Sequence, residues 1–436
     1  MNIICAYAVN LDAVCDVLVR EISSLLPGGL SSEKIGLKGS IARMEDLVSS
    51  LLYCMREGSG AEILIDSPAL ASRIEQAFTW QMRLGGNAGI MANVLVDLGA
   101  KPVLNAPAVG PRLAAMLHPE VRLPLSGSLA EPGRVAQAKK DDRPEPVHYV
   151  FQFKRGEKIQ YGRDRFIVPQ DNRFIASYDP VNTALLSSRD FDSYCLNHIS
   201  AFSGAMVSGF HLLPLQDYGK ILPEKINQLR SWKKRNPNLF IHLELGSFQS
   251  PRIMSHLLDL ISEVSIDSLG MNEQELDAAA GLLKLSIKTD PPASWQKSIL
   301  AAELLQDKTG IFRVSVHTRE YIISTMRDGL LSARDEILAL QSGVDAAASL
   351  AACGSIREAP PEEFNDKGLA AAADLRRLGA VGFGRGAILQ SGGRILSLVP
   401  ARQVSCPVIT VGLGDTATAS IFFCELEAIR KNAGPV

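Results

Sequence analysis

A short glycine-containing stretch near the end of the chain constrains the fold most. It reads Val-Gly-Leu-Gly-Asp-Thr at residues 411–416, with a β-branched run at 408–411 before it and an apolar run at 417–426 after it. This pattern predicts a strand, a tight glycine turn and a helix. Glycines let backbone N–H groups approach an anion, and a helix start adds partial positive charge there. We therefore expect an anion-binding turn.

An acidic residue, Asp415, directly follows the glycines of this turn, Gly412 and Gly414. A carboxylate beside a phosphate repels it unless the carboxylate handles a proton, so Asp415 is interpreted as a general base toward a hydroxyl nucleophile. On this hexapeptide alone, an Asp that merely caps the helix is the better interpretation. The remainder of the chain decides between the two.

Composition excludes several classes of protein. The 436 residues are 46% hydrophobic and 21% charged, with a formal net charge of -2, which is ordinary for a globular protein and leaves no basic surface for nucleic acid. No run approaches the ~18 apolar residues that a membrane span needs. The seven cysteines show no metal-binding spacing and no signal peptide is visible, so we expect buried thiols and a cytoplasmic protein. The oligomeric state stays open.

Apolar strand patterns and helical patterns alternate over most of the chain. The clearest predicted strands are 3–9, 239–245, 262–269 and 312–317. The clearest predicted helices are 12–26, 250–260, 272–282 and 330–340. This alternation predicts an α/β fold with a mostly parallel sheet and helices on both faces.

A different pattern interrupts this alternation early in the chain. Residues 148–154 and 165–178 alternate and are rich in strand formers, which predicts a small antiparallel sheet. Residues 126–146 are richer in Gly, Pro and charge and form the best internal boundary. We therefore predict a large α/β core and a small α+β lid that is inserted in two pieces.

Polar side chains follow the ends of several predicted strands. They are Asn10, Asp12, His242, Glu244, Glu275, His317 and Asp415. The carboxyl ends of parallel strands meet at one edge of a sheet, which is where α/β folds bind ligands. Carboxylate oxygens near phosphates suit Mg²⁺, which usually keeps several waters. The structural alternatives are a surface pair at Glu244, a capping box at Asn272 and Glu275, and an interior histidine at His317.

One reaction class uses an anion-binding turn, two acids and a base together, namely phosphoryl transfer from a nucleotide to a hydroxyl with Mg²⁺. The chain has no GxxxxGK[ST] motif and is therefore not a P-loop enzyme.

Six motifs occur in a fixed order along the chain. They are Asn10-Leu11-Asp12-Ala13, Gly85-Gly86-Asn87-Ala88-Gly89-Ile90, Asn172-Arg173-Phe174-Ile175, His242-Leu243-Glu244, Asn272-Glu273-Gln274-Glu275 and Gly412-Leu413-Gly414-Asp415. Together they resemble the ADP-dependent glucokinase and phosphofructokinase family of the ribokinase superfamily, over nearly the whole chain. The resemblance implies a ribokinase-like core with a β-containing lid, ADP as donor, AMP as product, Mg²⁺, and a place in modified glycolysis. The implied core is residues 1–12, 85–142 and 178–436, and the implied lid is residues 13–84 and 143–177.

The resemblance also implies a role for each matching residue. The catalytic base is Asp415, with Gly412 and Gly414 as its anion hole, and the acids that organise the metal and its waters are Glu244 and Glu275. The sugar-facing residues are Asn10, Asp12, Gly86, Asn87 and His148, with Arg173 as the lid arginine that reaches the donor phosphates. The nucleotide positions are Asn272, His317, Val404 and Gly414.

The chain departs from the family on the sugar side. Departures from the commonest family residue stand at Ala8, Asn87, Gln170 and His211. In the pair Ala61-Glu62, where glucose and fructose 6-phosphate enzymes differ, the missing acid at Ala61 favours fructose 6-phosphate. A basic run in the lid could hold a sugar phosphate or form a solvated strand face; it comprises Lys154, Arg155, Lys158, Arg163 and Arg165.

These observations predict an ADP-dependent sugar kinase that favours fructose 6-phosphate over glucose. The alternatives are an ATP-dependent sugar kinase of the wider ribokinase superfamily and a non-catalytic sugar or nucleotide sensor that keeps the fold. We expect a small-molecule sugar and ADP as partners, and neither nucleic acid nor a membrane.

Overall fold

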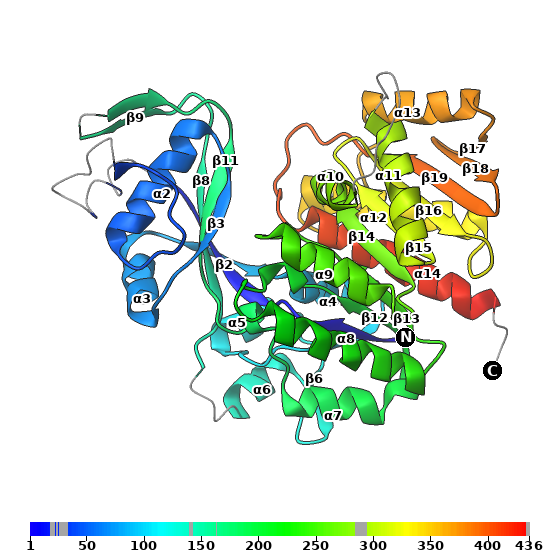
Figure 1. Cartoon of the computed structure of the whole chain (residues 1–436), viewed down its shortest axis with the longest axis horizontal. Coiled ribbons are helices and arrows are strands. Elements are labelled where there is room, and N and C mark those ends of the chain that lie inside the picture. Colours follow the sequence, from blue (N-terminus) through cyan, green and yellow to red (C-terminus); the bar gives the residue numbers. More distant parts are fainter. Residues whose placement is uncertain are drawn as a thin grey trace.

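Two sheets of unequal size organise the protein (Figure 1). The computed structural model describes residues 1–17, 22, 25, 34–138, 143–162, 164–283 and 294–432. Among these residues the larger sheet has ten strands. From one edge to the other they are β17 (Val381–Phe383), β18 (Gly386–Ser391), β19 (Arg394–Pro400), β16 (Tyr321–Arg327), β15 (Arg313–His317), β14 (Ser268–Asn272), β13 (Phe240–Glu244), β12 (Phe202–Val207), β1 (Asn2–Ala6) and β5 (Lys101–Leu104).

Neighbouring strands of this sheet are parallel from β5 to β15 and antiparallel from β15 to β17. Helices cover both of its faces, because successive residues of a strand point to opposite sides. Ile3 and Cys5 of β1 belong to one apolar cluster, which includes residues of α4 (Asn87–Asp97) and α14 (Leu413–Asn432). Ile4 and Ala6 belong to another, which includes residues of α8 and α9.

The remaining helices of the described core are α5 (Pro111–Met116), α6 (Pro132–Ala138), α7 (Arg189–Asn197), α8 (Tyr218–Arg235), α9 (Pro251–Ile261), α10 (Glu273–Leu282), α11 (Ser294–Thr309), α12 (Ala333–Cys353) and α13 (Asp366–Arg377), with short 3-10 turns η2 (Asn182–Ala184), η3 (Ile199–Ala201) and η4 (Phe210–Leu212). A two-stranded unit pairs β6 (Leu123–Leu125) with β7 (Ser128–Ala130). The arrangement confirms the predicted α/β class. In the described part of the chain, no helix is both long and apolar enough to cross a membrane.

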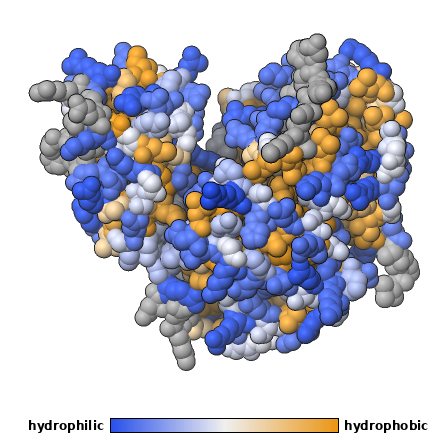
Figure 2. Space-filling model, in the orientation of Figure 1, coloured by the Kyte–Doolittle hydropathy of each residue, from blue (hydrophilic) through white to orange (hydrophobic). Residues whose placement is uncertain are grey.

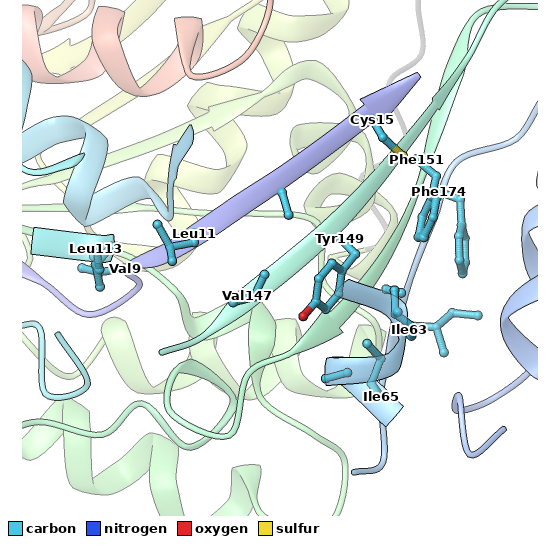
Figure 3. Close-up of a cluster of buried hydrophobic side chains, with 14 of the residues drawn as sticks. Val9, Leu11, Cys15, Ile63, Ile65, Leu113, Val147, Tyr149, Phe151 and Phe174 are labelled. Carbon is cyan, nitrogen blue, oxygen red and sulfur yellow. The ribbon is translucent and has the colours of Figure 1, made fainter. Parts of the chain in front are cut away.

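The smaller sheet contains five described strands: β3 (Ala61–Leu64), β11 (Asn172–Tyr178), β8 (Val147–Phe153), β2 (Asn10–Asp16) and β4 (Gln81–Gly85). Helices α2 (Met44–Glu57) and α3 (Pro68–Ala77) accompany it, and Figure 1 shows this unit beside the core. The face that α2 and α3 cover is apolar, and Figure 3 shows Tyr149, Phe151 and Phe174 there. The opposite face carries the polar residues of the same strands.

We propose that residues 13–84 and 143–177 form the lid, and that residues 1–12, 85–142 and 178–436 form the core. A separate hairpin of β9 (Lys158–Tyr161) and β10 (Asp164–Ile167) lies at the outer end of the lid (Figure 1).

Three sequence-based elements were wrong. The strand predicted at 262–269 begins only at Ser268, the start of β14, because residues 262–265 form a turn that follows α9. Residues 10–16, most of which were assigned to a helix at 12–26, form β2, because Leu11, Ala13 and Cys15 alternate into the lid's apolar cluster while the backbone pairs with β8 and β4. Most of the later part of that predicted helix lies outside the described residues. The run 408–411 is not a strand; the N–H groups of Val408 and Ile409 donate to the carbonyl of Ala351 at the end of α12.

Candidate active site

The two glycine positions of the turn at the start of α14 leave little room for a side chain. Gly412 has φ +76, and a Cβ there would lie 3.2 Å from Ile90 of α4. A Cβ at Gly414 would lie 2.9 Å from Nε2 of His317. The backbone N–H and the hydroxyl of Thr416 both donate to the carbonyl of Gly412, at 3.0 and 2.8 Å. The backbone of the turn, at the start of α14, therefore packs closely against α4 and against the end of β15.

Asp415 lies in the first turn of α14, as the sequence predicted, and Asn87 begins α4. The side-chain amide of Asn87 donates to Oδ1 of Asp415 at 2.6 Å. Burial raises the pKa of Asp415 to about 6, the Asn87 hydrogen bond opposes this rise, and the charge of Asp12 adds to it. A carboxylate that titrates just below neutral pH is well suited to act as a general base.

Asn10 and Asp12 of β2 lie beside the glycines that precede α4. The amide of Asn10 donates to Oδ1 of Asp12 at 2.7 Å, and a Cβ at Gly85 would overlap both side chains. Gly86 has φ +77, and a Cβ there would lie 2.5 Å from the carbonyl oxygen of Ala8. Burial raises the pKa of Asp12, and Asp12 in turn acts on Asp415. The structure thus brings the predicted sugar-facing residues to the predicted base.

His148 of β8 is the buried cation of this region. Its Nε2 lies 2.9 Å from Oδ2 of Asp179, and its Nδ1 lies 3.6 Å from Oε1 of Glu62. Burial alone would lower the pKa of His148, but the Asp179 hydrogen bond and the charges of Glu62, Asp179 and Asp12 raise it to about 9. A positive charge therefore stands among the acids of the lid at neutral pH.

Strand register defines the polar face of the lid sheet. Ser177, His148, Asp12 and Arg83 stand opposite one another on β11, β8, β2 and β4. Because side chains alternate along a strand, Arg173 of β11 shares this face with Ser177. The charge of Arg173 lowers the pKa of Asp12, which is otherwise raised by burial. Two arginines therefore share one face with the sugar-facing residues.

Ala61 and Glu62 point to opposite faces of β3. Ala61 packs against the lid's apolar cluster, whereas Oε1 of Glu62 accepts a hydrogen bond from the hydroxyl of Ser177 at 2.5 Å. Our interpretation of Ala61 as a position that faces the acceptor was therefore wrong. Glu62 reaches the polar face instead, and its signal in the sequence was its position between the apolar residues Ala61 and Ile63 of a strand.

Lys158 and Arg165 of the basic run lie away from this face, whereas Lys154 lies at its outer end beside Asp16. Lys158 and Arg165 are exposed on the β9–β10 hairpin, which pairs with no other strand of the described chain. Lys154 is exposed and lies 3.4 Å from Oδ2 of Asp16. Arg163 lies outside the described residues. The arrangement favours the alternative of a solvated strand face.

The two predicted metal-organising acids are buried beside the base. Glu244 ends β13, with Oε2 2.9 Å from Nε2 of His242 and a side-chain hydrogen bond to Thr418 of α14. Glu275 occupies the capping box of α10, and its two oxygens accept from the backbone and side-chain nitrogens of Asn272, both at 2.9 Å. The structural alternative for Asn272 and Glu275 is thus present, together with burial that raises the pKa of each glutamate to about 7.

The charges around these acids test whether Mg²⁺ fits. In the described residues no group of three or more His, Cys, Asp and Glu side chains is arranged to hold a metal directly. The charge of Asp415 nevertheless raises the pKa of both Glu244 and Glu275, and Glu244 further raises that of Glu275. This unbalanced negative charge, with carboxylate oxygens already hydrogen-bonded, fits a cation that keeps its waters, as Mg²⁺ commonly does.

The predicted nucleotide-binding residues differ in how closely the structure ties them to the glycine turn. His317 ends β15, its Nδ1 lies 3.8 Å from Oε1 of Glu244, and burial lowers its pKa, so the ring is neutral. Val404 is half-buried in the connection between β19 and α14, and its place beside an adenine stays a prediction. Thr418 was missed in the sequence, although its spacing of three from Asp415 places both on one helix face.

An open α/β sheet with a glycine turn and a buried carboxylate at its edge, beside the polar side of a second and smaller sheet, defines a class of two-sheet α/β proteins. Within this class, the chain belongs to the ADP-specific phosphofructokinase/glucokinase family, whose conserved region matches residues 1–424.

Relatives in this family include both named activities. The ADP-specific phosphofructokinase of Pyrococcus abyssi is 27% identical, over 99% of each chain. The ADP-dependent glucose/glucosamine kinase of Pyrococcus furiosus is 26% identical, over 97% of this chain and 94% of the relative. A solved ADP-dependent kinase in complex with fructose-6-phosphate and ADPβS shares the fold, with a TM-score of 0.81 and 23% identity over 99% of this chain and 94% of its own.

Proposed function

We propose that this protein is an ADP-dependent sugar kinase that transfers the β-phosphoryl group of Mg·ADP to a sugar hydroxyl and releases AMP, with fructose 6-phosphate preferred over glucose. The observation that carries the proposal is the position of Asp415. The buried carboxylate of Asp415 follows the glycine turn, accepts a hydrogen bond from the Asn87 amide and is close enough to Asp12 for that charge to raise its pKa.

The base acts first on the acceptor. Asn10, Asp12 and His148 bind the sugar so that one hydroxyl lies within reach of Asp415, which takes the hydroxyl proton as the oxygen attacks phosphorus. The Asn87 hydrogen bond orients the carboxylate and keeps its pKa from rising further, so that the base is available at neutral pH.

The charge of the transferring phosphoryl group is stabilised at the start of α14. Backbone N–H groups of the glycine turn and the helix dipole supply partial positive charge there. Bound Mg²⁺ would add charge neutralisation of the phosphates. Glu244 and Glu275 would hold it through its waters, and neutral His317 would contact the nucleotide beside Gly414.

The preferred acceptor follows from the charges on the lid face. Arg173 and Arg83 lie on the polar face near Asp12, and both can bind the 6-phosphate of fructose 6-phosphate through charge-assisted hydrogen bonds. The one acid of β3 on this face, Glu62, is held by Ser177 and by the His148 cation. The carboxylate of Glu62 is therefore already paired when a sugar phosphate binds to this face, which reduces its repulsion of the phosphate.

Closure of the lid would complete the site. Figure 2 shows the surface hollowed between the lid and the core, and an open hollow admits water that competes with the sugar for the phosphoryl group. We place this reaction in the cytoplasm, since none of the seven cysteines forms a disulfide in the described chain, as expected in a reducing compartment.

The decisive experiment is a coupled assay of sugar-phosphate formation with two donors, ADP and ATP, and two acceptors, fructose 6-phosphate and glucose. The proposal predicts turnover with ADP as donor and none with ATP. It also predicts a higher kcat/KM for fructose 6-phosphate than for glucose. Turnover with ATP alone would identify the protein as an ATP-dependent sugar kinase. Sugar binding in a calorimeter without AMP release would identify a sensor.

A further inference from the structure

A buried polar chain runs from Glu244 to the far side of the core. His242, Ser268 and Arg313 stand opposite one another on the adjacent strands β13, β14 and β15. Nη1 of Arg313 lies 3.1 Å from Oγ of Ser268, and that oxygen lies 2.9 Å from Nδ1 of His242. Nε2 of His242 lies 2.9 Å from Oε2 of Glu244. None of these four residues is more than 3% exposed.

Two carboxylates bind Arg313 at the far end of this hydrogen-bonded series. Nε of Arg313 lies 2.9 Å from Oε1 of Glu336 on α12 and 2.6 Å from Oε1 of Glu425 on α14. Burial raises the pKa of Glu425, the charge of Arg313 opposes this rise, and the charge of Glu336 adds to it. Arg313, which is paired with two carboxylates, therefore stands at the far end of this series of hydrogen bonds. One of the two carboxylates, Glu425, lies on α14, the helix that carries Asp415.

The contacts define a consistent direction for the hydrogen atoms along these four residues. The Glu244 carboxylate only accepts, so Nε2 of His242 carries the proton and donates it, and in the neutral ring Nδ1 is then an acceptor. Arginine has donors only, so Ser268 accepts from Arg313 and donates its hydroxyl proton to Nδ1 of His242. A Cβ at Gly270 would collide with both Nε2 of His242 and the Glu244 carboxylate, so β14 closes this contact to water.

We propose that Arg313, acting through Ser268, locks His242 in its Nε2–H tautomer and thereby makes His242 the positioning residue of Glu244. Oε2 of Glu244 is held by the imidazole, while Oε1 is left toward His317 and the site of the base. Outer partners of this kind orient metal-organising side chains, and their loss typically costs ~10–100-fold in metal affinity or activity. The functional part of this inference rests on the proposed role of Glu244, whereas the tautomer does not.

The tautomer is measured on the metal-free protein by ¹⁵N NMR of labelled histidines, with His242→Gln identifying the signal. We expect an unprotonated Nδ1 and a protonated Nε2, and a mixture of tautomers in Ser268→Ala. A protonated Nδ1 in the wild type would overturn the lock whether or not the protein is a kinase.

Mn²⁺ binding, followed by electron paramagnetic resonance with ADP present, measures the positioning. His242→Gln keeps an amide N–H near the place of Nε2–H, so it should bind Mn²⁺ within about threefold of wild type, whereas His242→Asn should lose ~10-fold or more. Ser268→Ala should resemble His242→Asn, and Ser397→Ala should be silent, because the buried Ser397 hydroxyl in the same sheet has no hydrogen-bond partner in the described chain. Equal losses in His242→Gln and His242→Asn would show a merely structural role and overturn the proposal.

Discussion

The side-chain amide of Asn87 donates to Oδ1 of Asp415 across 328 positions of sequence, at 2.6 Å. Each residue lies in the first turn of its helix, so the N-termini of α4 and α14 meet at one carboxylate. The hydrogen bond works against burial, which raises the pKa of Asp415 to about 6. Asn87 therefore tunes the pKa of the proposed base, in addition to the acceptor contact that we propose for it.

Removal of this hydrogen bond should shift the pH dependence of the reaction. In wild type, kcat/KM should fall as the pH drops through about 6, because protonated Asp415 cannot accept a proton. Asn87→Ala removes the contact that lowers this pKa, so the acidic limb should move to higher pH. Asn87→Gln, which keeps an amide, should move it less. A limb that stays in place in Asn87→Ala would contradict the tuning role.

Asp415→Asn should abolish general-base catalysis without abolishing nucleotide binding. Loss of a positioned base typically lowers turnover ~10²–10⁴-fold. In the proposed site the phosphates are bound by backbone N–H groups of the glycine turn, so the dissociation constant of ADP should change little. The measurements are kcat in the coupled assay and the ADP affinity by calorimetry. Near-normal turnover of the variant would refute the assignment of the base.

Neutral replacements of the two acids should separate their metal role from their structural one. Glu244→Gln and Glu275→Gln should each raise the Mg²⁺ concentration needed for half-maximal rate. Glutamine keeps the capping-box geometry at Glu275, since it too serves at the third helical position. If both variants show the wild-type Mg²⁺ dependence, Glu244 and Glu275 serve only the hydrogen bonds that the structure shows.

The raised pKa of Glu275 also predicts a pH-dependent stability difference. Its pKa is about 7 in the folded protein against 4.5 ordinarily, so the folded state binds more protons between these values. The free energy of unfolding contributed by this group therefore falls as pH rises from 4.5 to 7. Without Mg²⁺, Glu275→Gln should melt above wild type at pH 8 and level with it near pH 4.5. Mg²⁺ and ADP should reduce the gap at pH 8, and a gap of the opposite sign would refute the shift.

The clustering of site residues could be predicted because it follows from topology. Glu244 and His317 were placed correctly at strand ends by their apolar runs, and Asp415 by its glycines. What alternation and capping cannot reveal is pairing between distant segments. The backbone of β2 pairs with β4 and β8, which overrode its helical pattern, and Arg313 looks like an ordinary strand residue until Glu336 and Glu425 meet it in the core. The orientation of Ala61 could have been read from the alternation with Ile63, which packs in the lid core.

The last prediction concerns the arginines that we propose to bind the acceptor phosphate. Arg83 stands opposite Asp12, and Arg173 acts electrostatically on Asp12 from β11. Hydrogen bonds to charged groups contribute ~1.5–3 kcal/mol, so Arg83→Met and Arg173→Met should each lower kcat/KM for fructose 6-phosphate by about 10- to 100-fold. Glucose has no phosphate, so its kcat/KM should change much less in Arg83→Met.

The matched control is Arg165→Met, which removes an exposed arginine from the outer β9–β10 hairpin of the same lid. It should leave both sugars unaffected, because that hairpin does not share the polar face of the lid sheet. Equal losses for both sugars in Arg83→Met would mean that this arginine supports the lid and does not select the acceptor. A wild type that phosphorylates glucose and ignores fructose 6-phosphate would overturn the substrate preference and leave the kinase proposal intact.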